Sequence, residues 1–153
     1  MPFTVRLRRL GYRVAYWMLH LAWLAGRPAR RGVKCALTDG DRVLLVCHTY
    51  GRRRWDLPGG TLQRRESAPA AARREMHEEL GVDVADWTAI GELRGVGRHR
   101  RDTIQCFHAE LRAPSLILDL GEIAQVHWFE RERLPADIGP HVVPLLARVP
   151  GRG

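Results

Sequence analysis

The feature that most constrains this chain is a segment whose expected helical side chains divide into two unlike faces. Residues 67–80 predict a helix, because Ser67 is a favourable N-terminal cap and Gly81 is typical of the position that follows a helix. Three apolar side chains at four-residue spacing predict a face that packs on a core: Ala72, Met76 and Leu80. The remaining positions carry charge, so they decide what this helix can do.

The charged face of this helix brings three carboxylates together. Glu75, Glu78 and Glu79 stand at positions i, i+3 and i+4, which share one side of a helix, where like charges repel. A hard divalent cation such as Mg²⁺ or Mn²⁺ is a natural counter-charge, since it prefers oxygen ligands. The alternative is a solvated acidic face with Arg73 and Arg74 as its salt-bridge partners.

The residues on either side of these glutamates follow a longer pattern. Five residues separate Gly60 from Glu66, and seven more separate Glu66 from the pair Arg74 and Glu75. Together with the residues that follow as far as Val82, this spacing resembles the Nudix box, G-x5-E-x7-R-E-U-x-E-E-x-G-U, in which U is apolar. Every fixed position of that pattern is occupied, so the flanking residues favour the cation over the solvated acidic face.

The resemblance implies a fold and a division of the chain. The order of expected elements resembles the family over roughly residues 32–149. It implies an α/β fold, a Nudix-like α/β/α sandwich with a mixed sheet, to which this chain adds an N-terminal basic amphipathic helix. Residues 1–31 lie outside the resemblance. We therefore expect a helical arm over residues 1–31 and a Nudix hydrolase domain over residues 32–153.

The elements themselves are expected from apolar runs and turn signals. The Asp39-Gly40 pair between two β-branched runs is a strong hairpin signal. Strands are expected over residues 33–37, 42–48, 87–96, 103–111 and 126–129, and a last short helix over residues 140–149. Strands with one clear central helix favour a mixed α/β domain, in agreement with the resemblance.

The resemblance also implies roles for individual residues. Glu78 and Glu79 would be metal ligands, and Glu75 would be a ligand or an acid–base group. A backbone carbonyl of Gly59 or Gly60 would complete the metal shell. Arg74 would orient the glutamates, and Glu66 would hold the junction between loop and helix.

A further acid is expected from a late loop. Members of the family often carry one shortly before a strand that contains an aromatic residue. Glu122, six residues before Trp128, fits this description as an additional ligand or general base. The alternative for Glu122 is an ordinary solvated loop carboxylate.

The resemblance does not specify which substrate is hydrolysed, because Nudix enzymes act on nucleoside diphosphates that carry many different attached groups. Nudix enzymes hydrolyse such compounds with Mg²⁺ or Mn²⁺, and we expect a MutT-like action on (deoxy)nucleoside triphosphates. Markers that some subfamilies carry after the box, a proline or a tyrosine, are absent from residues 97–99. The alternatives are a nucleotide sugar or dinucleotide-type substrate, a lipid-linked or isoprenoid diphosphate, and a catalytically silent nucleotide sensor on the same fold.

Two basic loops are candidates for gripping the phosphates. One precedes residue 55 and the other joins two expected strands, and arginine forks suit phosphate oxygens. The alternative is that both loops are solvated, in a chain whose only lysine is Lys34. The candidate substrate-binding residues are Arg54, Trp55, Arg98, Arg100 and Arg101. Trp55 is a candidate for stacking on a base, and the alternative is a role in the core or in a turn.

The charge of the chain is concentrated at its beginning. The chain has 25 basic and 17 acidic residues, and eight of the basic ones but no acid fall within residues 1–34. The remainder is neutral, which argues against contacts with long nucleic acids. Three cysteines without a paired spacing exclude a disulfide framework and favour reduced thiols in the cytoplasm.

This basic beginning also has helical periodicity. Arg6, Arg9 and Arg13 fall near one side of a helix, whereas Leu10 and Val14 belong to an apolar stripe on another. A basic amphipathic helix favours contact with an anionic membrane surface or with a partner helix. The alternatives are a helix packed on its own domain, a homodimer contact and, because arginines precede an apolar stretch, a signal peptide.

Overall fold

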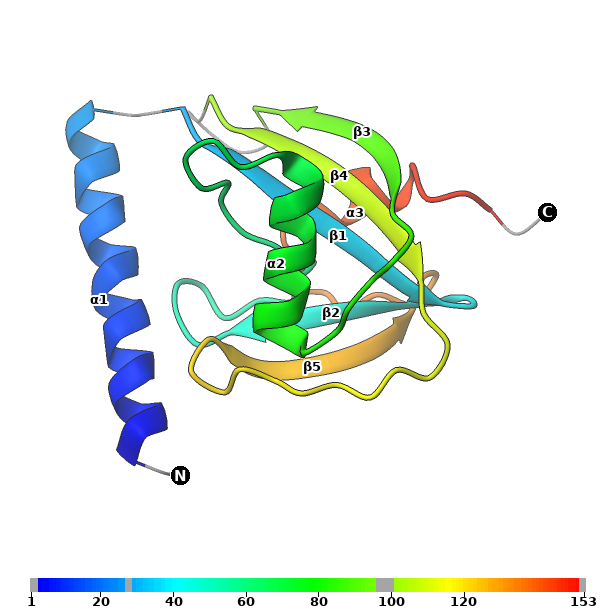
Figure 1. Cartoon of the computed structure of the whole chain (residues 1–153), viewed down its shortest axis with the longest axis horizontal. Helices are drawn as coiled ribbons and strands as arrows, with labels where there is room; N and C mark the ends of the chain where they lie inside the picture. Colours follow the sequence, from blue (N-terminus) through cyan, green and yellow to red (C-terminus); the bar gives the residue numbers. More distant parts are fainter. Residues whose placement is uncertain (1–2, 27–28, 96–100, 152–153) are drawn as a thin grey trace.

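The computed structural model describes residues 3–26, 29–95 and 101–151 (Figure 1). The elements in chain order are α1 (Phe3–Gly26), β1 (Arg31–Asp39), β2 (Arg42–His48), α2 (Ala68–Leu80), β3 (Thr88–Arg94), β4 (Thr103–Glu110), β5 (Ile123–Glu130) and α3 (Val142–Leu146). The expected central helix and hairpin are confirmed. The last strand begins earlier than the sequence predicts, at Ile123, and the last helix is shorter.

The strands form one mixed sheet in the order β3-β4-β1-β2-β5. The central pair β1 and β4 is parallel, and the three other pairs are antiparallel. The hairpin between β1 and β2 pairs Asp39 with Arg42, and Gly40 takes a positive φ of 61° in its turn. This mixed sheet with helices on its faces confirms the predicted fold class.

Alternation along β1 builds a core on each side of the sheet. Cys35 and Leu37 belong to the cluster that also holds Met76 and Leu80 of α2. Ala36, between them, belongs to the opposite cluster with Leu145 of α3. In Figure 1, α2 accordingly lies in front of the sheet and α3 behind it. The loops at the ends of β1 and β2 are thereby placed beside α2.

Helix α1 runs along the side of this sandwich (Figure 1). It is held by polar and aromatic contacts: Arg8 pairs with Asp119, and Nε of Arg9 donates to the carbonyl oxygen of Leu120 over 2.9 Å. A helix that packs on its own domain was expected to bury its apolar stripe. The structure differs, since that stripe is exposed. Among the described residues, no helix combines the length and the hydropathy that crossing a membrane requires.

Candidate active site

Helix α2 is fixed at both ends and along its apolar face. The Ser67 hydroxyl accepts a hydrogen bond from the Ala70 N–H, and Gly81 ends the helix in a left-handed conformation with φ of 65°. Met76 and Leu80 are fully buried. The same packing draws Glu75 and Glu79 inward, where they are 8% and 0% exposed, whereas Glu78 stays exposed.

Glu79 has a hydrogen-bond partner for each carboxylate oxygen. Oε2 accepts from the backbone N–H of Gly59 over 3.1 Å. Oε1 lies 3.2 Å from Nε2 of His48, and because a carboxylate only accepts, the imidazole is the donor. The turn before the helix and the end of β2 therefore meet at this buried carboxylate.

Arg74 organises the other glutamates. Its guanidinium makes two parallel bonds to Glu66, with Nε to Oε1 at 2.8 Å and Nη2 to Oε2 at 3.0 Å. Its Nη1 donates to Glu75 over 2.8 Å and to Glu78 over 3.0 Å. These bonds raise the pKa of Arg74 and keep it cationic. Arg73, the other expected partner of the acidic face, is exposed.

Glu75 is held in an environment that disfavours its charge. Burial and then the charge of Glu79 raise its pKa to about 7, although the contact with Arg74 acts in the opposite direction. The Glu75 carboxylate also lies so close to Gly60 that a side chain at position 60 would displace it. A Cβ at Gly60 would lie 2.3 Å from Oε1 of Glu75.

Glu122 reaches the same place from the loop before β5. Its Oε1 accepts a hydrogen bond from the Tyr50 hydroxyl over 2.8 Å. Burial and then the charge of Glu79 raise the pKa of Glu122. Single ligand atoms of His48, Glu79 and Glu122 lie within 4.8 Å of one another.

The sequence pattern did not indicate two residues of this group, His48 and Tyr50. The signal for His48 was strand alternation, because Leu44 and Val46 of β2 face the core on the α2 side and residue 48 continues that series. Tyr50 lies beyond the strand, and only the path of the chain after β2 brings its hydroxyl to Glu122.

The grouped donors fit a divalent cation. The charge of Glu79 raises the pKa values of both Glu75 and Glu122, and the charge of Glu122 also raises the pKa of Glu75, so negative charge is concentrated here. Carboxylate oxygens are the ligands that Mg²⁺ and Mn²⁺ favour, and imidazole nitrogen is tolerated by the softer of the two. The Gly60 carbonyl accepts a bond from the Val33 N–H over 2.8 Å and keeps a second lone pair.

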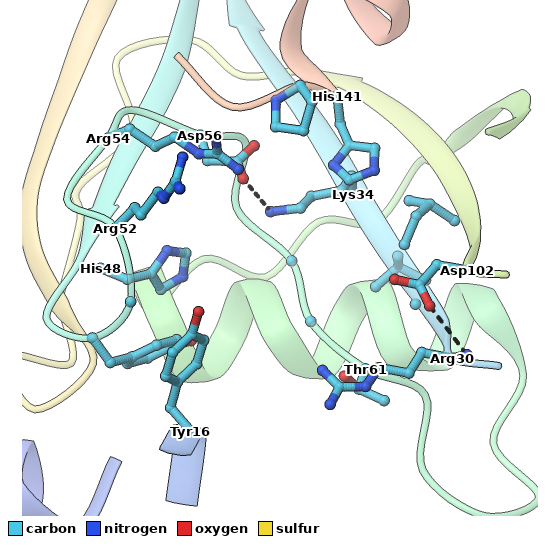
Figure 2. A pocket seen from close by; sticks show the side chains of 18 of the residues that line it. Tyr16, Arg30, Lys34, His48, Arg52, Arg54, Asp56, Thr61, Asp102 and His141 are labelled. Carbon is cyan, nitrogen blue, oxygen red and sulfur yellow. Dashed lines mark hydrogen bonds and ion pairs between the residues drawn. The ribbon is translucent and has the colours of Figure 1, made fainter. Parts of the chain in front are cut away.

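A cleft of about 580 Å³ lies beside this group (Figure 2). Gly59, Gly60 and His48 form one of its walls, so the cleft borders the residues that contact the buried glutamates. Its lining is rich in basic side chains: Arg30, Arg31, Lys34, Arg52 and Arg54. This charge suits a polyanionic ligand.

One of these cations is already paired within the protein. Nζ of Lys34 lies 3.2 Å from Oδ2 of Asp56 and donates to the carbonyl oxygen of Leu57 over 2.8 Å. Burial acts to raise the pKa of Asp56, but the Lys34 ammonium and the Leu57 N–H outweigh it and lower that pKa. Burial and then the charge of Lys34 lower the pKa of the neighbouring His141. Figure 2 shows the Lys34–Asp56 pair beside His141.

The structure separates the predicted substrate-binding residues. Arg54 lines the cleft. Trp55 instead packs on the core under α3, with its ring edge-to-face with Phe129 at 5.0 Å, and it is not among the cleft-lining residues. Arg101 is exposed away from the described lining, and Arg98 and Arg100 lie outside the described residues.

Helix α1 contributes to the cleft, which the sequence did not indicate. Tyr16 and His20 line it, and their rings stack at 6.2 Å. Tyr16 also contacts the ring of Tyr50, with the centroids 5.7 Å apart. The arm thus lies against the residue that holds Glu122.

Comparisons with known proteins agree with this geometry. The family model described as the NUDIX domain matches residues 28–149. A putative 8-oxo-dGTP diphosphatase of Bacillus subtilis is 32% identical over 110 residues, which are 69% of this chain and 68% of that protein. The ADP-ribose pyrophosphatase of Mycobacterium tuberculosis is 43% identical over 62 residues, 38% of this chain and 30% of that protein. The chain thus spans less than a third of that second relative.

Solved structures share the fold. A MutT NUDIX hydrolase from Burkholderia pseudomallei superposes with a TM-score of 0.73 at 21% identity, covering 80% of this chain and 99% of that one. The NUDIX domain of Shewanella oneidensis NrtR, complexed with ADP ribose, gives a TM-score of 0.68 at 17% identity, covering 84% and 94%. At these identities the likeness concerns the fold.

Proposed function

Since the chain belongs to the Nudix hydrolase family, we propose that it is a metal-dependent pyrophosphohydrolase that cleaves a diphosphate linkage of a nucleoside triphosphate, in a MutT-like manner. The observation that carries the proposal is the group formed by the buried Glu75 and Glu79 and the half-buried Glu122 beside an arginine-lined cleft. The Bacillus subtilis relative, named a putative 8-oxo-dGTP diphosphatase, supports the choice of substrate class.

The metal would be held by carboxylates from two elements. Glu78 and Glu79 of α2 and Glu122 of the loop before β5 would supply the oxygens, with the Gly60 carbonyl as a further donor. A bound Mg²⁺ or Mn²⁺ would neutralise phosphoryl oxygens and make phosphorus more open to attack by water. His48 would hold Glu79 in place through its hydrogen bond.

Glu75 is the proposed general base. Its raised pKa of about 7 makes it a better proton acceptor for water than an ordinary glutamate, and Arg74 fixes its orientation. Arg74 contacts Glu66, Glu75 and Glu78 together, so it acts as a positioning residue for the whole group. The attacking water would lose a proton to Glu75 and bond to one phosphorus of the diphosphate linkage. The bond from that phosphorus to the bridging oxygen would break, so that a nucleoside monophosphate and pyrophosphate are the products.

Arg52 and Arg54 are the proposed phosphate-binding side chains. Both line the cleft, and they lie on the loop after His48, whose imidazole is hydrogen-bonded to Glu79 (Figure 2). Tyr16 and His20 offer flat rings in the same cleft, and these suit stacking on a nucleobase. The volume of about 580 Å³ is that of a small-molecule site.

A dinucleotide-type diphosphate is the second candidate. The Mycobacterium tuberculosis relative is named an ADP-ribose pyrophosphatase, and the Shewanella oneidensis structure holds ADP ribose. In this chain, aromatic rings line the cleft together with arginines, so it offers surfaces for both a base and phosphates. A nucleotide sugar would place the same demands on these residues.

A substrate screen tests the proposal. The full chain would be incubated with Mg²⁺ or Mn²⁺ and nucleoside triphosphates, 8-oxo-dGTP, ADP-ribose, nucleotide sugars, dinucleoside polyphosphates or a 5′-triphosphate RNA. We expect metal-dependent cleavage of the triphosphates, abolished by EDTA. Preferred cleavage of ADP-ribose or a nucleotide sugar would establish the second candidate. Binding of nucleotide without cleavage of any compound would contradict hydrolysis and favour a nucleotide sensor.

A further inference from the structure

Helix α1 presents a continuous apolar surface that no other described part of the protein covers. We call it the outer face. Its residues are between 50% and 65% exposed: Leu7, Leu10, Val14, Trp17, Met18 and Leu21. At 100° per residue they fall within one sector of the helix, so they form a stripe rather than scattered contacts. An apolar patch of this kind marks an interaction surface.

The orientation of α1 is fixed by contacts on the opposite side. The guanidinium of Arg8 binds the Asp119 carboxylate, and the Tyr12 hydroxyl donates to the same group over 3.3 Å. The rings of Tyr12 and Tyr16 both pack near Tyr50, at 6.1 and 5.7 Å. Helix α1 is therefore attached to the domain even though its apolar stripe is exposed. The domain holds α1 by its polar and aromatic side and turns the apolar side outward.

The charge around the outer face restricts what can cover it. Arg6 and Arg13 are exposed along one border of the stripe. Residues 1–34 contain eight basic residues and no acidic one. A second copy docked by the same face would bring these arginines together without a compensating carboxylate from that segment, which costs free energy. An anionic surface with an apolar interior satisfies both the arginines and the stripe.

We propose that the outer face of α1 docks this protein on the surface of an anionic lipid membrane, with the helix lying in the plane of that surface. Leu10, Val14 and Leu21 would enter the boundary between headgroups and acyl chains, with Trp17 at the headgroup level. Arg6 and Arg13 would extend to lipid phosphates, as long cationic side chains do at an interface.

Docking by this face would leave the cleft accessible. Tyr16 and His20 line the cleft from the opposite side of the same helix. The membrane would therefore cover the outer face without covering the glutamates. The proposal is independent of which nucleotide the protein hydrolyses, so its failure would leave the proposed hydrolysis untouched.

The test is co-sedimentation of the full chain with vesicles. One set contains phosphatidylcholine alone, and the other contains equal parts of phosphatidylcholine and phosphatidylglycerol. We expect the protein to pellet with the anionic set, less so at high salt, and to remain in the supernatant with the neutral set. Recovery in the supernatant with both sets would overturn the proposal.

A matched pair of variants tests the face. Leu10→Glu places a carboxylate on the outer face, whereas Leu19→Glu places the same carboxylate on an exposed leucine outside it. We expect Leu10→Glu to lower vesicle partitioning by about tenfold and Leu19→Glu to lower it much less. Equal losses would show that net charge alone, and not this face, drives binding.

A second measurement separates the membrane from a second copy. Sedimentation velocity without vesicles is expected to give one species of the same mass for the wild type and for Leu10→Glu. A dimer that Leu10→Glu dissociates, together with no vesicle binding, would overturn the proposal and assign the face to self-association. Retained hydrolysis of a soluble nucleotide by both variants would confirm that they are folded.

Discussion

The hydroxyl of Tyr50 donates a 2.8 Å hydrogen bond to Oε1 of Glu122, and this bond joins the loop after β2 to the carboxylate group. The other side of the Tyr50 ring system faces α1, where Tyr12 and Tyr16 contact it. The charge of Glu122 is thereby influenced by a residue that itself depends on α1 for packing. Residues outside the Nudix box therefore contact the site through Tyr50.

The first prediction concerns this bond. Tyr50→Phe removes a donor to Glu122, and since that bond lowers the pKa of Glu122, its loss raises the pKa further. We expect the acidic limb of the kcat/KM profile to move to higher pH, with kcat/KM lowered roughly tenfold near neutral pH. Tyr12→Phe is the control, because the Tyr12 hydroxyl bonds Asp119 instead. A profile unchanged from the wild type would exclude a role for Glu122.

The second prediction concerns stability against pH in metal-free protein. Glu75 has a folded pKa of about 7 against an ordinary value of 4.5. A carboxyl with a raised folded pKa contributes stability below pH 4.5 that is lost as pH rises through 7, by about 3 kcal/mol from this group alone. The free energy of unfolding, measured with urea and EDTA, should therefore fall over that window.

Two controls accompany this measurement. Glu75→Gln cannot ionise, so its unfolding free energy should lack this part of the decline. Adding Mg²⁺ should restore stability most at high pH, where the carboxylates are ionised and bind the cation best. Stability that rises steadily with pH in the absence of metal would contradict the described environment of Glu75.

The third prediction concerns the Arg74 fork. Arg74→Lys keeps the charge but cannot make the paired bonds to Glu66 while also reaching Glu75 and Glu78. We expect a loss of about 2 kcal/mol in the free energy of unfolding and a fall in kcat larger than any change in KM. Arg73→Lys, on the exposed neighbour, should change neither. Wild-type kcat in Arg74→Lys would show that the glutamates need no such positioning.

The fourth prediction concerns Gly60. In Gly60→Ala the new methyl group would lie 2.3 Å from Oε1 of Glu75, so the carboxylate or the turn must move. We expect weaker Mg²⁺ binding, measured by calorimetry, and at least a tenfold loss of hydrolysis. Gly151→Ala is the matched control, because nothing lies within 4 Å of its Cβ. Unchanged metal affinity together with unchanged hydrolysis would show that neither the Gly60 turn nor the position of Glu75 matters to the site.

The sequence predicts the part of the site that lies on one helix. Residue spacing along α2 specifies which glutamates share a side, and the apolar positions Met76 and Leu80 specify which side is buried. The mixed sheet follows from the strand pattern and from the family resemblance. These predictions succeed because they depend on local periodicity.

What the sequence does not predict depends on contacts across the fold. His48 and Tyr50 reach the glutamates from another strand and its loop. Their positions in the sequence follow no spacing that is typical of metal ligands. Trp55 was a candidate for stacking on a base or for a core role, and its ring packs on the core against Phe129. Burial of the apolar stripe of α1 on the domain was one alternative, but Arg8 pairs with Asp119 on another side of the helix and the stripe is exposed.

The measurement that tests the central claim most directly compares the wild type with Glu78→Gln, a substitution on an exposed side chain that should leave the fold intact. Hydrolysis of a nucleoside triphosphate would be followed by ³¹P NMR with Mg²⁺ present, after circular dichroism has confirmed that both proteins are folded. The account predicts metal-dependent turnover in the wild type and a loss of about a thousandfold or more in Glu78→Gln. Equal turnover by the two folded proteins would contradict catalysis by this group of glutamates.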